Sequence, residues 1–282
     1  MKKKFGTDLT IIIGLIVGIG LIAYGITDGG KVSNFISFSS MAITFGGTIT
    51  ATFMSFPVST FKYIPKHMKI ILAKKEYLPQ VYIDKVIDYA IEAKRKGLLA
   101  LEGKANVEKD EFMKRGVLLI VDAIEPTEAR TILEAELDCL EERHTKGWQI
   151  YERAASFAPA FGMIGTLIGL INMLKSLTDT GAADAASTLG LGMSVALITT
   201  LYGVLLANLV LIPIASRLQC RHYEEMICKE VVLEGILSIH AGVNPRITEE
   251  RLNVFVNNHE RRTEDEPVKE RSRGRGRGRL RK

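Results

Sequence analysis

Four long stretches of this sequence contain no charged residue, and each is long enough to cross a membrane. They hold 19, 30, 21 and 32 residues and lie between Asp8 and Asp28, Lys31 and Lys62, Arg153 and Lys175, and Asp184 and Arg217. A helix needs about 20 apolar residues to span the hydrocarbon core of a bilayer. The sequence therefore predicts an all-α, polytopic membrane protein with four transmembrane helices and a helical cytoplasmic domain.

The charged residues are concentrated between and after these stretches, and they set the expected orientation. Residues 62–153 hold 17 lysines and arginines, the chain begins Met1-Lys2-Lys3-Lys4, and the region after Arg217 is also basic. Cytoplasmic segments next to membrane spans carry an excess of lysine and arginine. We therefore expect both termini and the central segment in the cytoplasm, with two short loops outside.

Local signals within the central segment favour helices and indicate where they end. Apolar residues recur near helical period after Val81. Gly97 interrupts that pattern and predicts a turn, whereas Glu125-Pro126-Thr127 predicts a helix start with proline in the first turn.

The pattern divides the chain into five expected segments. These are two transmembrane helices with a short external loop in 1–57, a cytoplasmic helical domain in 58–153, two further transmembrane helices in 154–216, a cytoplasmic helical extension in 217–266, and a basic tail in 267–282. High charge and few apolar residues predict a disordered tail. Its arginines would be attracted to anionic membrane lipid; RNA is an alternative, but no specific nucleic-acid partner is expected.

No pattern typical of an enzyme, a metal site or a cofactor site is visible. The cysteines lack the C-x-x-C spacing of zinc and redox motifs, the histidines form no i, i+4 pair, and no nucleophile–base pair stands out. We therefore expect no enzymatic activity and no cofactor. The residues concerned are Cys139, Cys220, Cys228, His67, His144, His222, His240 and His259.

The third and fourth uncharged stretches each carry a stripe of small residues with one threonine. A small face allows another helix to approach closely, and the threonine hydroxyl can bond its own backbone or a group across the gap. Such a stripe is also compatible with ordinary helix packing. The two stripes are Pro159, Gly162, Thr166 and Gly169 in the third stretch, and Ala196, Thr200, Gly203 and Ala207 in the fourth.

The uncharged stretches contain no acid or base that could carry a proton or sodium ion. Ion paths through lipid need ionisable or strongly polar groups, which are rare in spans and functional where they occur. If this chain conducts ions, the ionisable group must come from another chain. We therefore expect a partner helix to pack against the small faces.

Three motifs in order resemble the flagellar motor stator proteins MotA and PomA. The run from Phe157 to Gly169 resembles their third helix, and the run from Ala196 to Pro213 resembles their fourth. The segment Ala93-Lys94-Arg95-Lys96-Gly97-Leu98-Leu99-Ala100-Leu101-Glu102 is similar to their rotor-facing cytoplasmic loop. The resemblance covers about residues 5 to 255.

This resemblance implies an assembly in the bacterial cytoplasmic membrane. Five such subunits would surround two copies of MotB, a single-span protein anchored to peptidoglycan, whose membrane-embedded aspartate binds the ion. Ion passage would turn the ring, and the cytoplasmic loop would push the rotor protein FliG. Protons are the expected ion and sodium is the alternative.

The resemblance also implies roles for individual residues. Pro159 and Pro213 would shape bends that couple ion binding to movement, because proline removes a backbone hydrogen bond. Thr166 and Thr200 would lie beside the aspartate of the partner. The small residues Gly162, Gly169, Ala196, Gly203 and Ala207 would pack around the partner helix.

On the cytoplasmic side, Lys94 and Glu102 would form the charged pair that contacts the rotor, with Arg95 as an additional contact. Two alternatives remain open on the sequence. The first is an energy-transducing subunit of the TolQ or ExbB type, which usually has three spans. The second is a membrane scaffold that conducts no ions.

Overall fold

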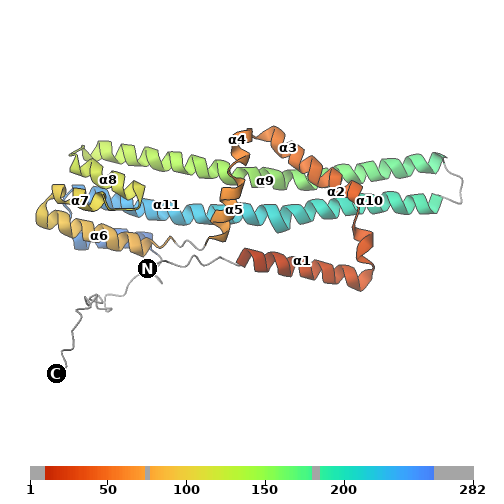
Figure 1. The fold of residues 1–282 in the computed structure, drawn as a ribbon, viewed down its shortest axis with the longest axis horizontal. Helices are drawn as coiled ribbons and strands as arrows, with labels where there is room; N and C mark the ends of the chain where they lie inside the picture. Colours follow the sequence, from red (N-terminus) through yellow and green to blue (C-terminus); the bar gives the residue numbers. More distant parts are fainter. Residues whose placement is uncertain (1–9, 74–76, 180–184, 257–282) are drawn as a thin grey trace, which may run out of the picture. The chain divides into compact units, whose positions relative to one another are not determined.

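A computed structural model describes residues 10–73, 77–179 and 185–256, and all regular secondary structure in these ranges is helical. Figure 1 shows that long helices dominate the fold. This confirms the all-α prediction. The described chain separates into two compact units, one within Met1–Leu78 and Thr127–Glu230, the other within Pro79–Pro126 and Val231–Lys282.

Two helices in the described ranges are long and apolar enough to cross a membrane, Pro126–Ser176 and Leu189–His240. A third span results if the pair Ile12–Asp28 and Val32–Ser55, bent by 117° at its break, is counted as one. Four spans would require both members of that pair to cross separately. The number four therefore stays a prediction, whereas the long apolar helices themselves are confirmed.

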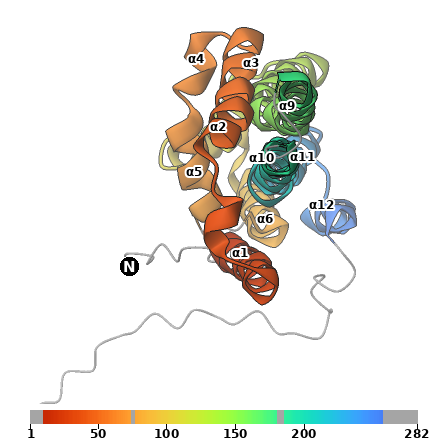
Figure 2. The ribbon, with the colours of Figure 1, turned by 90° about the vertical axis from the view of Figure 1, so that its right-hand side faces the viewer.

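The first unit contains the apolar helices. Its elements are α1 (Thr10–Gly29), η1 (Val32–Phe35), α2 (Phe38–Met41), the π-helix η2 (Ala42–Gly46), α3 (Gly47–Ser55), α4 (Val58–Phe61), α5 (Ile64–Leu72), most of α9 (Pro126–Asp179), α10 (Ala185–Leu205), the π-helix η4 (Leu206–Leu211) and the first part of α11 (Ile212–His240). Two views show α9 and α10 side by side (Figures 1 and 2).

A cluster of large side chains joins α5, α9 and α11 near the middle of α9. Trp148 and Tyr151 of α9 pack there with Ile71 of α5 and Leu218 of α11. Further along, the contact is made by alanines instead of aromatic residues: Ala155 and Ala158 pack against Ala207. Smaller side chains allow helix axes to approach more closely.

The second unit is built from α6 (Pro79–Lys96), η3 (Leu98–Leu101), α7 (Glu102–Ala105), α8 (Glu111–Val121), the end of α11, α12 (Pro245–Leu252) and η5 (Asn253–Phe255). Its core is apolar and well buried. Gly235 of α11 lies directly against the side chain of Val86 on α6, so that side chain occupies the space that a larger residue at 235 would need. The most buried core residues include Ile83, Val86, Leu101, Met113, Ile120, Val232, Ile236 and Leu252.

Both local signals from the sequence are confirmed. The helix α9 begins at Pro126 and continues through both the polar and the apolar part of its sequence. Gly97 follows the last residue of α6 with φ of +84°, a conformation that favours glycine.

Two histidines that are 78 residues apart in sequence meet in the first unit. Nδ1 of His144 on α9 lies 3.1 Å from Nδ1 of His222 on α11, and the rings are nearly perpendicular. Trp148 lies next to them, with its ring centroid 5.0 Å from that of His222. A hydrogen bond between two ring nitrogens needs one of them protonated and the other free.

The surroundings of this pair favour the neutral rings. Burial lowers the pKa of both histidines, because desolvation disfavours the charged form. At His144 the carboxylate of Glu225 opposes that effect, whereas His222, Arg143 and Lys66 reinforce it. If both rings were protonated to imidazolium, two positive charges would be in contact.

We predict that this pair makes the stability of the chain depend on pH. At His222 the carboxylates of Glu141 and Glu225 oppose the effect of burial without reversing it. Because both folded-state pKa values lie below the ordinary 6.5, the unfolded chain binds more protons, and stability falls as the pH drops through that value. The melting temperature of the detergent-solubilised protein should therefore fall less on acidification in His144→Gln than in the wild type. Equal pH dependence would contradict this role.

Candidate functional sites

Glycines on α9 bring this helix into backbone contact with α10. A methyl group added at Gly162 would lie 3.1 Å from the carbonyl oxygen of Thr199, and one added at Gly165 would lie 2.5 Å from the Thr199 side chain. At Gly169 it would lie 2.6 Å from the carbonyl oxygen of Gly192. At Gly165 and Gly169 only a residue without a side chain allows this separation, whereas at Gly162 the neighbouring backbone would have to shift by a few tenths of an ångström.

The small face of α10 makes the reciprocal contact. A methyl group at Gly203 would lie 2.5 Å from the carbonyl oxygen of Ala158 and 3.1 Å from Cα of Pro159. Ala196 also lies against Gly169, and Ala207 is almost fully buried. The two predicted stripes therefore meet each other along the helix pair.

This arrangement gives the small residues a packing role within the chain itself. Gly162, Gly169, Ala196, Gly203 and Ala207 were expected to pack around a partner helix, but in the described chain they pack α9 against α10 and η4. A helical wheel identifies residues that share a face but does not identify what that face contacts. Any additional contact of these residues with a partner stays a prediction.

The two predicted threonines are partly exposed, and their own helices satisfy their hydroxyls. The hydroxyl of Thr166 donates to the carbonyl oxygen of Met163 at 2.6 Å, and that of Thr200 donates to the carbonyl oxygen of Ala196 at 3.2 Å. Each oxygen can still accept a further hydrogen bond. Both threonines could therefore interact with a protonated group or a cation without losing their present bonds.

The sequence interpretation missed Thr199, which is fully buried between three elements. Its side chain faces Gly165 of α9, and its carbonyl oxygen accepts a hydrogen bond from the hydroxyl of Thr44 in η2. Its own hydroxyl donates to backbone carbonyls one turn earlier. Thr199 precedes Gly203 by four residues, so the stripe could equally have been drawn through it.

The two predicted prolines lie in different helical settings. Pro159 is inside α9, which continues past it to Asp179. Pro213 is the second residue of α11 and follows the π-helix η4 directly. Because proline has no N–H, the carbonyl of Leu209 lacks its usual α-helical donor. A π-helical segment changes the hydrogen-bond register where that donor is missing, and the sequence did not predict it.

The predicted rotor-contact residues form an exposed surface in the second unit. Lys94 and Arg95 lie in the last turn of α6, and Glu102 is the first residue of α7. All three are exposed. Between them, Gly97 turns the chain and its N–H donates to the carbonyl of Ala93 at 2.8 Å. The basic residues at the end of α6 and the acidic residue at the start of α7 therefore lie on either side of the turn at Gly97.

Ion pairs fix the connection from α7 to α8 against α6. Nζ of Lys104 lies 2.8 Å from a carboxylate oxygen of Asp88 and 2.5 Å from one of Glu92. Nζ of Lys85 lies 2.7 Å from the carboxylate of Glu108. These contacts join residues 12 to 23 positions apart, so they hold α7, which begins with Glu102, and the segment after it against α6.

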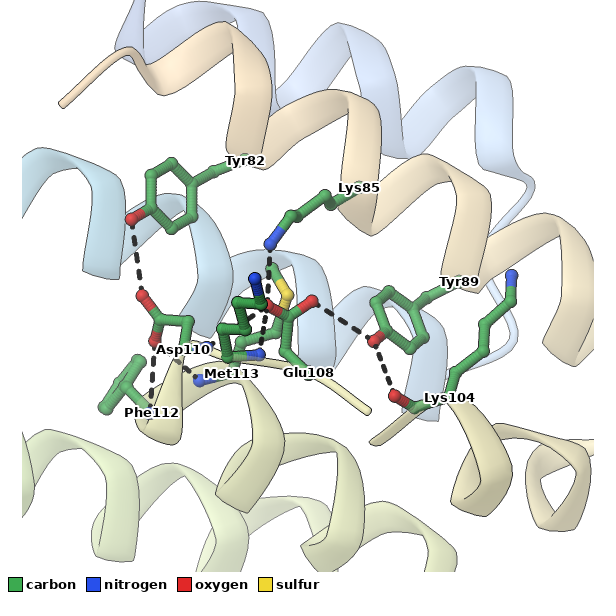
Figure 3. A network of polar contacts seen from close by, with 9 residues as sticks. Tyr82, Lys85, Tyr89, Lys104, Glu108, Asp110, Phe112 and Met113 are labelled. Atoms are coloured by element: carbon green, nitrogen blue, oxygen red, sulfur yellow. Dashed lines mark hydrogen bonds and ion pairs between the residues drawn. The ribbon is translucent and has the colours of Figure 1, made fainter. Parts of the chain in front are cut away.

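Tyr89 lies between Lys104 and the Lys85–Glu108 ion pair (Figure 3). Its hydroxyl is 3.4 Å from both the carbonyl oxygen of Lys104 and a carboxylate oxygen of Glu108. Burial, together with Glu108, raises the pKa of Tyr89 to about 12. Burial also acts to raise the pKa of Glu108, but bonds from Lys85 and from the N–H groups of Asp110 and Lys109 outweigh it and lower that pKa.

No group of three or more His, Cys, Asp or Glu side chains is placed to hold a metal ion within the described ranges. His259 and the basic tail lie outside these ranges.

We predict that the glycine contact between α9 and α10 tolerates no side chain. The Gly165→Ala variant should lose about 1–3 kcal/mol of stability, because the added methyl group overlaps Thr199. The matched control is Gly190→Ala on α10, where nothing lies within 4 Å. Thermal unfolding in detergent should show a lower melting temperature for the first variant alone.

The sequence and the fold both match proteins of one family. Residues 104–231 match the model of the MotA/TolQ/ExbB proton channel family. The chain is 39% identical to Bacillus subtilis YtxD over 95% of its own length and 96% of that protein. It is 38% identical to Motility protein A of Treponema phagedenis over 90% of its length and 96% of that protein.

A solved structure gives the same result. The flagellar MotAB stator complex from Bacillus subtilis contains a chain that matches with a TM-score of 0.79 and 29% identity, covering 89% of this chain and 96% of that one. Together with the long apolar helices, these relatives identify a multi-pass membrane protein. The chain belongs to the MotA/TolQ/ExbB proton channel family.

Proposed function

We propose that this chain is the ion-conducting stator subunit of a bacterial flagellar motor. With a MotB-type partner, it couples proton flow across the cytoplasmic membrane to torque on the rotor protein FliG. The observation that carries this proposal is the likeness, over nearly the whole chain, to a subunit of a solved flagellar stator complex. Relatives called Motility protein A, matched at similar coverage, support it.

The partner supplies the chemistry that this chain lacks. No acid or base lies in the sequence of the third and fourth uncharged stretches, so the ion-binding carboxylate belongs to the MotB-type subunit. Five copies of this chain surround two copies of that subunit. Thr166 and Thr200 lie beside the carboxylate and accept a hydrogen bond from its protonated form or contribute an oxygen ligand to sodium.

The prolines allow the helices to change shape during the cycle. The backbone around Pro159 and Pro213 lacks one hydrogen bond at each position, and η4 adds a π-helical segment next to the second. Such segments have more than one available hydrogen-bond pairing. Protonation and release of the partner's carboxylate would shift the helices at these points.

Torque is transmitted through the charged turn of the second unit. Lys94, Arg95 and Glu102 are exposed, and the ion pairs of Lys104 and Lys85 hold α7 and the segment after it against α6. A rigid support is needed because a flexible loop would absorb the force. We place this surface, both termini and residues 217–266 in the cytoplasm, on the distribution of lysine and arginine.

The alternatives are an energy-transducing subunit of the TolQ or ExbB type and a scaffold that conducts no ions. Motility proteins match nearly the whole chain, including the charged turn, which favours the stator. Neither an enzymatic activity nor a cofactor forms part of this proposal, and the five sequence segments and the fourth span remain predictions.

We predict that the transported ion can be identified from swimming speed. The chain and its MotB-type partner should restore motility to a flagellated host that lacks its own stators. For a proton-driven stator, a protonophore stops swimming at every external sodium concentration. Speed that rises with sodium and persists with the protonophore would establish sodium instead. A complex that assembles but restores no motility would overturn the stator proposal.

We predict that reversing the charge at the rotor surface reduces torque without preventing assembly. Lys94→Glu and Glu102→Lys should each lower swimming speed by at least about half, because exposed charges contribute little to stability but set the complementarity of a contact. The control is Lys109→Glu, an exposed reversal in the same unit. Membrane abundance of the complex is measured in parallel. Normal swimming in both variants would contradict the assigned contact.

A further inference from the structure

The segment from α2 to α3 carries four buried hydroxyl groups at intervals of four residues. They belong to Ser40, Thr44, Thr48 and Thr52, all of which are almost completely buried. Thr48 and Thr52 donate to carbonyl oxygens of their own segment at 2.6 and 2.7 Å. Ser40 donates to the neighbouring hydroxyl of Ser37. Three of the four therefore form local bonds.

Thr44 differs, because its hydroxyl donates to another helix. The acceptor is the carbonyl oxygen of Thr199 on α10, at 3.3 Å, and both residues are fully buried. Thr44 lies in the π-helix η2, where the register differs from that of the flanking α-helices. The bond joins residues 155 positions apart in the sequence.

The acceptor of this bond, the carbonyl oxygen of Thr199, lies directly before Thr200 on α10. On one side of α10 the α9 glycines contact Thr199, and on another side Thr44 holds its carbonyl. These two contacts restrict rotation of α10 about its own axis. Rotation at residue 199 changes where the adjacent Thr200 points, since the hydroxyl of Thr200 bonds to Ala196 of the same helix and turns with it.

We propose that Thr44 is a positioning residue, which sets the orientation of Thr200 toward the ion through its hydrogen bond to the Thr199 carbonyl. This inference rests on the function proposed above. Within lipid, water does not replace a lost hydrogen bond. Removing the Thr44 hydroxyl therefore removes one of the contacts that fix the rotation of α10 at residue 199.

Hydrogen bonds of Tyr202 would still join α10 to the segment before α2 if the Thr44 bond were removed. The hydroxyl of Tyr202 donates to the carbonyl oxygen of Phe35 at 2.6 Å and accepts from the N–H of Ser37 at 3.2 Å. Loss of the Thr44 hydroxyl should therefore change the orientation of α10 without separating it from the α2 region.

The test compares Thr44→Val with Thr48→Val in the full complex with the MotB-type partner. Valine has nearly the shape of threonine but no hydroxyl, and Thr48 loses only a bond within its own segment. Swimming speed is measured against the concentration of the driving ion. Thr44→Val should raise the half-saturating ion concentration about threefold to tenfold, the range expected for one hydrogen bond. Thr48→Val should leave it unchanged, and Thr44→Ser should restore it.

The outcomes separate this inference from the proposed function. If the wild-type complex drives no swimming, the stator proposal fails. If the wild type swims and both valine variants show the wild-type half-saturating concentration, the positioning role of Thr44 is overturned. A lower maximal speed with reduced membrane abundance, but an unchanged half-saturating concentration, would show a purely structural role and would also overturn it.

Discussion

The close approach of α9 and α10 is the constraint on which the rest of the first unit depends. Gly165 and Gly169 on one helix and Gly203 on the other leave no room for a methyl group. Lipid tails are as apolar as the side chains, so no hydrophobic effect drives these helices together. Close packing of this kind is therefore a main source of their association. The contact also determines which residues stay outside it. Thr166 and Thr200 stay partly exposed, while Thr199 is buried.

The two units differ in how their polar side chains are satisfied. In the uncharged stretches of the first, hydroxyls are satisfied by backbone carbonyls, as at Thr48 and Thr52. In the second, charged side chains brace a short turn through ion pairs, with Lys104 contacting both Asp88 and Glu92. Exposed ion pairs individually contribute little to stability. Several that share residues can nevertheless restrict a loop to one conformation.

Much of the fold could be predicted from the sequence because it depends on local properties. Charge-free stretches predict long apolar helices, Pro126 predicts the start of α9, and Gly97 predicts the turn that separates Lys94 from Glu102. Each of these follows from one residue type and its near neighbours. The π-helical segments η2 and η4 were not predicted, because their hydrogen-bond register depends on how the helices pack.

The sequence by itself determined which residues share a helix face and which charged residues lie together on one turn. Only the tertiary structure decided what each face contacts. It placed the small residues between α9 and α10, buried Thr199 beside Thr44, and brought His144 to His222. The physical reason is that helical periodicity is a local property of the backbone, whereas a contact between residues 78 or 155 positions apart depends on the packing of whole helices.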